Sequence, residues 1–220
     1  MLLTPEQNCY FLGPTQGQVK VENCNAHMIR QQVGHFLYVL DRQKGEISVF
    51  NSNRMTIIER ISMNDPTEFA MSPNLDLLAV TINSSDTVAF VDIDPSSATF
   101  HQIVKSASVG KGPRGIAWQP GNEDILVCNE AGDTLSIISA FSLTERKRVS
   151  AQLNRPFDVV AMPRQAGAGN GYQRNVYFAY ILNRNGNVAL FESGPNGVNG
   201  WGYDDVIGIA PFTFNSPKKL

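Results

Sequence analysis

The chain of 220 residues carries 18 Lys and Arg against 20 Asp and Glu, a net charge of -2 at pH 7, and neither sign forms a long block. Nucleic-acid binding requires a clustered basic face, so this balance argues against DNA or RNA as a partner. The longest strongly apolar stretch, Val176 to Leu182, is too short to span a bilayer.

Residues 1–34 depart from the pattern of the rest of the chain. Residues 10–12 and 19–21 resemble a hairpin, but too few residues separate them from the next hairpin for a complete four-stranded unit. The first residues lack the basic segment of a signal peptide. Cys9, Cys24 and Cys128 cannot all pair within the chain, and both a Cys9–Cys24 disulfide and three buried thiols remain open. Their spacing does not match a metal site.

Four predicted hairpins follow, each made of two β-rich runs around a polar turn that opens on Asp or Asn. An Asx side chain suits this position because it can bond to the backbone two residues on and tolerates strained dihedral angles. The paired runs are 36–40 with 47–50, 77–82 with 87–93, 125–128 with 134–138 and 176–182 with 188–191, and the turns open at Asp41, Asn83, Asn129 and Asn183.

A proline phrase precedes each of the last three hairpins. An apolar strand lies between two prolines in 66–73, 113–120 and 156–163, and the copies begin 47 and then 43 residues apart. A fourth run completes each unit, as at 56–61 and 100–104. A repeat of this length built from strands predicts a β-propeller with blades of four antiparallel strands. No stretch combines helical periodicity with helix caps.

We therefore predict an all-β fold, a single β-propeller domain over residues 1–220 with about four full blades plus a partial or shared one. Residues 1–34 are expected to form a degenerate or closing blade, 35–210 contain the clear repeats, and 211–220 begin a further repeat at Pro211. Two arrangements fit this pattern. Either N- and C-terminal strands pair in a shared closing blade, or the chain is a fragment of a seven-bladed propeller.

The best preserved hairpin carries a family resemblance. Residues 78–93, preceded by 70–73 and followed by 109–113, resemble the YVTN-type β-propeller repeat of bacterial surface-layer-like proteins, and the likeness extends over about residues 35 to 192. Asn74-Leu75 and Gly121-Asn122 depart from the Asp-Gly turn of that repeat. The resemblance implies the fold, but propellers of this kind serve as binding scaffolds, sugar-lactone hydrolases and electron-transfer partners alike.

The residues after the first proline of each phrase begin the innermost strands and are expected to surround the mouth of the central channel. Glu68, Arg114 and Asp158 are the charged residues at these positions. They form a candidate site for a small molecule or a partner, with solvated or mutually paired rim charges as the alternative. The turn residues Asp41, Asn83, Asn129 and Asn183 are expected at the same end and are further candidates for binding.

The opposite end is predicted to carry two long Gly-rich loops, 164–173 and 193–203. Their aromatic residues Tyr172, Trp201 and Tyr203 suggest a recognition surface for a protein or glycan, with flexible decoration as the alternative. Catalytic signals are poor, because His27, His35 and His101 are scattered, His101 in a predicted outer strand, and no serine stands in a nucleophile-elbow phrase. We predict neither a metal site nor a cofactor.

These observations predict a non-catalytic binding or scaffold module for a protein or glycan partner. The low charged fraction of 17% and the many Gly, Asn and Ser residues favour a periplasmic, secreted or cell-surface location in a bacterium. The alternative function is that of a propeller hydrolase similar to the lactonases, acting on a sugar lactone at the channel mouth with Glu68, Arg114 and Asp158.

Overall fold

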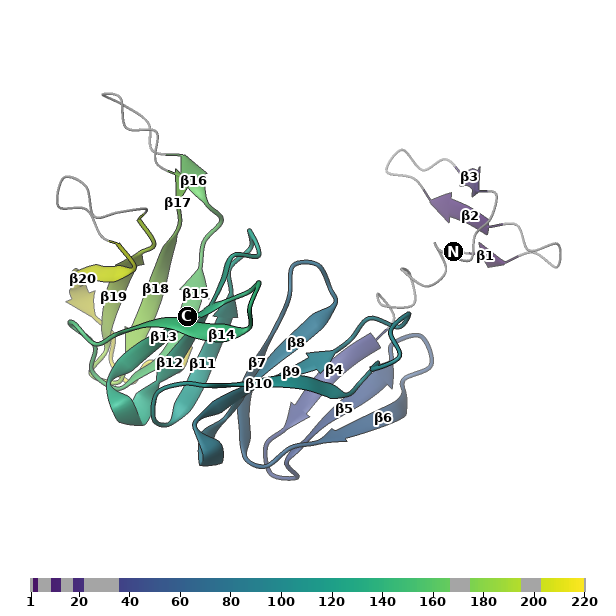
Figure 1. Ribbon diagram of the computed structural model, residues 1–220, viewed down its shortest axis with the longest axis horizontal. Coiled ribbons are helices and arrows are strands. Elements are labelled where there is room, and N and C mark those ends of the chain that lie inside the picture. The colour runs from purple at the N-terminus through teal and green to yellow at the C-terminus, as the bar shows by residue number, and fades with distance from the viewer. Residues whose placement is uncertain are drawn as a thin grey trace.

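The computed structural model of the protein describes residues 36–166, 175–194 and 203–219, together with three short strands before residue 36. The described part is built from antiparallel strands, and its helical segments are two short 3₁₀ turns, Asn83–Ser85 and Glu130–Gly132. Figure 1 shows the sheets following one another as the blades of an arc. The predicted all-β propeller of antiparallel blades is confirmed.

Four sheets form the arc, and we number them blades 1 to 4 in chain order. Blade 1 has three strands, β4 (Phe36–Asp41), β5 (Glu46–Asn51) and β6 (Thr56–Ser62). Blade 2 has β7 (Pro66–Met71), β8 (Leu77–Ile82), β9 (Thr87–Asp92) and β10 (Ile103–Ser108). Blade 3 has β11 (Pro113–Trp118), β12 (Asp124–Asn129), β13 (Thr134–Ser139) and β14 (Thr144–Val149). Blade 4 has β15 (Pro156–Ala161), β18 (Phe178–Asn183), β19 (Asn187–Glu192) and β20 (Asp205–Thr213).

Two small sheets accompany the blades. β16 (Gln165–Ala166) and β17 (Asn175–Val176) pair as an extension of blade 4, and β1 (Leu2–Leu3), β2 (Cys9–Leu12) and β3 (Gln18–Val21) form a separate sheet. Among the described strands, β20 pairs with β19, and β1 to β3 pair with one another. The shared closing blade expected from the sequence is therefore not formed by the strands that the structure describes.

Apolar side chains pack between successive blades. Tyr38 and Val49 of blade 1 meet Val80 of blade 2, and similar clusters join blade 2 to blade 3 and blade 3 to blade 4. Because side chains alternate across a strand, each inner blade buries one set against the preceding blade and the other against the following blade. This explains why the central strands read as almost continuous apolar runs.

The end blades keep apolar side chains exposed on the face turned away from their neighbours. Tyr38 packs toward blade 2, and Leu37 and Val39 alternate with it along the strand. They therefore lie on the face of blade 1 that is turned away from blade 2, and both are exposed. Val160 and Tyr180 are cross-strand partners in blade 4 and are likewise exposed. In the interior of a propeller, such faces are covered by further blades.

The link between two blades has a repeated backbone conformation. A residue with positive φ stands directly before each opening proline: Asp65 (56°), Gly112 (66°) and Arg155 (47°) precede Pro66, Pro113 and Pro156. Beyond blade 4 the same conformation recurs at Ser216 (51°), which precedes Pro217.

Hydrogen bonds show that the segment after blade 4 is equivalent to the link between blades 1 and 2. The Phe214 N–H donates to the Gly186 carbonyl (2.9 Å), as the Met63 N–H donates to the Gly45 carbonyl (2.7 Å). The equivalent of the opening prolines is thus Pro217, whereas Pro211, predicted to begin a further repeat, lies within β20. Lys218 and Lys219 consequently occupy the positions that Thr67 and Glu68 occupy in blade 2.

Candidate functional site

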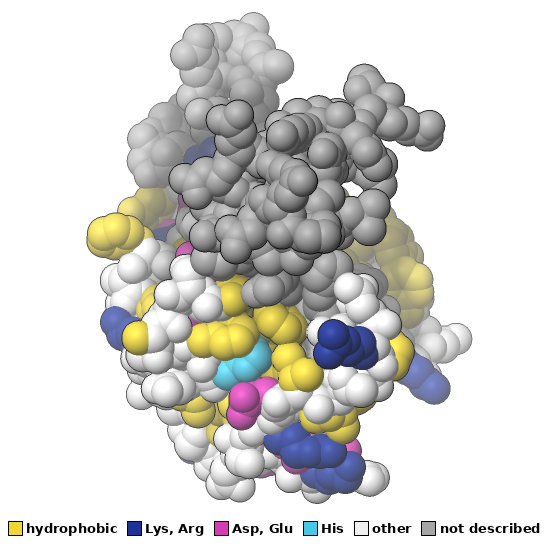
Figure 2. Space-filling view, turned by 90° about the vertical axis from the view of Figure 1, so that its right-hand side faces the viewer, with side chains coloured by type: hydrophobic (Ala, Val, Ile, Leu, Met, Phe, Trp, Pro, Cys, Tyr) yellow, Lys and Arg dark blue, Asp and Glu magenta, His cyan; other side chains and the backbone are white. Residues whose placement is uncertain are grey.

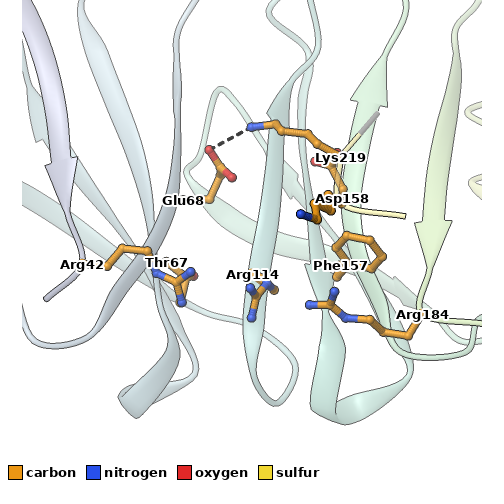
Figure 3. Close-up of a pocket in the computed structure, with 9 residues that line it drawn as sticks. Arg42, Thr67, Glu68, Arg114, Phe157, Asp158, Arg184 and Lys219 are labelled. Atoms are coloured by element: carbon orange, nitrogen blue, oxygen red, sulfur yellow. Dashed lines mark hydrogen bonds and ion pairs between the residues drawn. The ribbon is translucent and has the colours of Figure 1, made fainter. Parts of the chain in front are cut away.

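The beginnings of the innermost strands converge on one hollow at one end of the arc of blades. β7, β11 and β15 each place the residues after their opening proline there, and the segment after blade 4 adds the residues after Pro217 (Figure 3). The hollow has a volume of about 100 Å³. It is lined by Arg42, Thr67, Glu68, Arg114, Phe157, Asp158, Arg184, Lys218 and Lys219.

The three charged residues selected from the sequence are brought together in this hollow. Glu68, Arg114 and Asp158 all line it, and Figure 3 shows Arg114 between the other strands that contribute to it. Sequence reasoning missed four of the five cationic residues. Two carry a recognisable signal, because Arg42 and Arg184 directly follow the Asx residues that open the hairpin turns.

Glu130 organises the arginines on one side of the hollow. Its carboxylate accepts two hydrogen bonds from Arg184 (2.8 and 3.0 Å) and one from Arg155 (2.9 Å), and lies 3.4 Å from the Arg114 guanidinium. The hydrogen bonds from Arg184 hold the pKa of Glu130 below its usual value, and the other two arginines act in the same direction. The Arg184 guanidinium also lies 3.7 Å from the centre of the Phe157 ring, a cation–π contact.

The other side of the hollow is less constrained. Lys219 pairs with Glu68 at 3.3 Å (Figure 3). Arg42 and Lys218 are exposed and form no ion pair with any residue that the structure describes. With Arg114 and Arg184, five cationic groups thus face a hollow that holds two carboxylates, those of Glu68 and Asp158.

Two local features hold the inner strands in place below the charged groups. The buried Thr67 hydroxyl lies 2.8 Å from the Thr81 hydroxyl and donates to the Pro113 carbonyl at 2.9 Å, which ties blade 2 to blade 3. Gly115 lets β11 approach β15 closely, because a Cβ there would lie 2.6 Å from the Cα of Asp158. Because Gly115 has no side chain, β11 and β15 can lie close enough to bring Arg114 and Asp158 to the same hollow.

The turn residues predicted as binding candidates lie at the same end but do not line the hollow. Asp41 forms the expected Asx turn, since its Oδ1 accepts the N–H groups of Gln43 and Lys44 (3.1 Å each). Asn83 begins a 3₁₀ turn and is half-buried. Asn129 and Asn183 are buried and bond to neighbouring backbone and hydroxyl groups.

At the opposite end, Tyr172 and Trp201 lie outside the described residues. Tyr203 is 52% exposed, and Lys147 both donates to its carbonyl oxygen (2.6 Å) and sits 5.2 Å from the centre of its ring. Cys9 belongs to β2 and Cys24 to a segment outside the described residues, so a Cys9–Cys24 disulfide also lies outside the described side chains. Cys128 is a buried free thiol.

His101 lies in the turn before β10 and not in an outer strand. Its Nε2 is 3.1 Å from the Tyr38 hydroxyl, and its ring stacks on Phe100 with centroids 3.7 Å apart. Figure 2 shows a histidine with hydrophobic side chains around it and an acidic side chain beside it. Burial lowers the pKa of His101, although the charges of Glu59 and Asp92 oppose this shift.

Within the part of the chain that the structure describes, no cluster of three His, Cys, Asp or Glu side chains is placed to bind a metal ion. None of the helices described is long and apolar enough to cross a membrane.

Comparison with known proteins supports the fold. The family described as "Lactonase, 7-bladed beta-propeller" matches residues 11–112. Among solved structures, the chain is similar to Kuenenia stuttgartiensis hydrazine synthase (TM-score 0.60, 16% identity, 83% of this chain and 47% of that one). It is also similar to the dihydro-heme d1 dehydrogenase NirN in complex with DHE (TM-score 0.52, 15% identity, 72% of this chain and 32% of that one).

No curated relative matches the sequence. The chain spans about half of the hydrazine synthase chain and about a third of the NirN chain. At these identities the likeness establishes a propeller architecture, and the family match adds a similarity to seven-bladed propeller lactonases over residues 11–112.

Proposed function

We propose that the protein is a non-catalytic binding or scaffold module of the YVTN-like kind, whose protein or glycan partner docks at the channel mouth. The observation that carries this proposal is the hollow itself, which gathers side chains from separate blades at the start of their inner strands. Residues far apart in the chain converge there on elements held rigidly by inter-blade packing, as recognition sites require.

The size of the hollow favours recognition of part of a larger partner. Its volume of about 100 Å³ compares with roughly 300–1,000 Å³ for pockets that enclose a small-molecule ligand. A site of this size holds one functional group, while the rest of the partner lies on the surrounding end of the propeller. We place this activity outside the cytoplasm, a proposal supported by the charged fraction of 17%.

A lactonase-like hydrolase is the second candidate, and two observations favour it. Residues 11–112 match the lactonase propeller family, and Glu68, Arg114 and Asp158 line the same hollow. In such a reaction a carboxylate would activate water as a general base, and the guanidinium would stabilise the developing oxyanion.

The two functions are separated by testing the whole chain for turnover and for binding. Hydrolysis of neutral and acidic sugar lactones is followed by pH-stat titration, and binding to peptide and glycan panels is followed by biolayer interferometry. The proposal expects binding that weakens in Arg114→Ala and lactone hydrolysis no faster than in buffer. Hydrolysis above the buffer rate that disappears in Glu68→Gln and Asp158→Asn would establish the hydrolase instead.

A further inference from the structure

We infer that the hollow is an oxyanion site that receives a carboxylate from an acidic segment of a protein partner. The inference rests on the proposed function and names the chemistry of the partner. It depends on the juxtaposition of Arg42, Arg114, Arg184, Lys218 and Lys219 around a space for a single group.

The charges of the hollow are unequal and only partly compensated. Glu68, one of its two carboxylates, is paired with Lys219, and neither Arg42 nor Lys218 forms an ion pair with a described residue. On the opposite side, Glu130 supplies one negative charge against Arg114, Arg155 and Arg184. Five cationic side chains and two carboxylates thus line the hollow, although the whole chain has a net charge of -2, and such a local excess of positive charge attracts anions.

The cations are of two kinds, fixed and free. Arg184 is fixed by two hydrogen bonds to Glu130 and by its contact with the Phe157 ring, and Glu130 also lies near Arg114. A guanidinium already held in place loses little freedom when an anion arrives. Arg42 of blade 1 and Lys218, which follows blade 4, also line the hollow, and neither is held by an ion pair to a described residue, so both can move toward the anion.

The shape of the space favours a carboxylate on a flexible stem. Aspartate and glutamate side chains carry their carboxylate at the end of methylene groups, so the group can enter while the peptide backbone stays outside. In an acidic glycan the charged group is attached to or near a sugar ring, and the ring itself would have to approach a hollow of about 100 Å³. The planar guanidinium fork also matches the two oxygens of a carboxylate.

The test uses the whole chain and fluorescence anisotropy with a labelled Glu-Gly repeat peptide, a Gln-Gly repeat of equal length, and a heparin oligosaccharide. We expect the Glu peptide to bind and the Gln peptide to bind at least about tenfold more weakly. The affinity for the Glu peptide should fall as the salt concentration is raised. Arg42→Ala and Lys218→Ala should each weaken binding of the Glu peptide by about fivefold to tenfold. Glu68→Gln should strengthen it, because one competing carboxylate is removed.

Arg54→Ala is the matched control. Arg54 is also an exposed arginine of blade 1, but its turn joins β5 to β6 at the opposite end, so the affinity should not change. Equal binding of the Glu and Gln peptides, or equal effects of Arg42→Ala and Arg54→Ala, would overturn the inference. Heparin binding that requires Arg42, without peptide binding, would overturn the assignment to a protein partner.

These outcomes are separate from a failure of the proposed function. Lactone turnover that depends on Glu68 and Asp158 would refute a non-catalytic module even if the peptide binds. Peptide binding that is insensitive to the hollow variants would refute the oxyanion site while leaving a binding module in place.

Discussion

The strongest prediction concerns the ion-pair network that joins blades 3 and 4. Arg146 donates two hydrogen bonds to Asp124 (2.8 Å each) and further hydrogen bonds to Asp204, while the Tyr177 hydroxyl donates to Asp124 at 2.7 Å. The side chains of Asp124 and Asp204 are only 8% and 4% exposed. The hydrogen bonds that Arg146 donates to Asp204 and Asp124 raise the pKa of Arg146, so the guanidinium stays charged.

Arg146→Ala leaves two buried carboxylates without their cation. Breaking a buried ion pair in this way costs about 3–5 kcal/mol, and we expect the lower end because the Arg146 side chain is 35% exposed. Unfolding in urea, followed by tryptophan fluorescence, to which the buried Trp118 contributes, should then show a midpoint lower by about 1–2 M. Urea is preferred to guanidinium because it does not screen ion pairs.

Arg148→Ala is the control for this experiment. Arg148 lies on the same strand and pairs with Glu145 at 2.8 Å, but it is 41% exposed, so its loss should cost about 0.5 kcal/mol. Adding Asp204→Asn to Arg146→Ala should restore part of the lost stability, since one buried charge is removed. Equal effects of Arg146→Ala and Arg148→Ala would refute the argument from burial.

Three further substitutions test other parts of the structure. Burial lowers the pKa of His101, so its contribution to stability is present above the ordinary pKa of 6.5 and is lost as the pH falls below that value. The midpoint temperature of thermal unfolding should therefore fall more steeply between about pH 7 and 5 for the wild type than for His101→Gln. Gly115→Ala should lower the free energy of unfolding by about 1–3 kcal/mol, because the new Cβ would overlap the backbone at Asp158. Thr81→Val should cost about 1–3 kcal/mol in the same assay, because it removes the hydroxyl that bonds to Thr67 and to the backbone of blades 2 and 3.

Each of these has a control within the chain. Gly208→Ala adds a Cβ with no atom within 4 Å, and Thr56→Val changes an exposed threonine on an outer strand. If Gly115→Ala proves as mild as Gly208→Ala, the inner strands are not closely packed. If Thr81→Val costs no more than Thr56→Val, the hydroxyl bridge contributes nothing. A pH profile unchanged in His101→Gln would show that His101 is not the titrating group.

Local sequence signals were sufficient for the repeat and for the hairpins. The predicted runs 77–82 and 125–128 coincide with or lie within β8 and β12, because β-rich strands bounded by Asx turns depend on neighbouring residues. The opening prolines begin β7, β11 and β15 for the same reason, since each follows a fixed backbone conformation. Counting residues from these prolines also brought Glu68, Arg114 and Asp158 to one place.

Signals of that kind failed where strand identity depends on pairing partners. Pro211 has the local appearance of an opening proline, yet it lies in β20 because residues 205–213 pair with β19. His101 was expected in a strand but lies in a turn, where it packs on Phe100 and approaches Tyr38 of the neighbouring blade. The pairing of β20 with β19 and the contact between His101 and Tyr38 join residues that no short window contains.

By itself, the sequence determined the repeat length, the high strand content and the positions at which inner strands begin, because these depend on backbone preferences of Pro, Asx and β-branched residues. The tertiary structure alone decided which charges share the hollow and how they are compensated. Glu130 collects arginines from three different segments, and Lys219 reaches Glu68 across 151 residues of chain. Coulomb interactions depend on distances in space, and only the folded arrangement of the blades sets those distances.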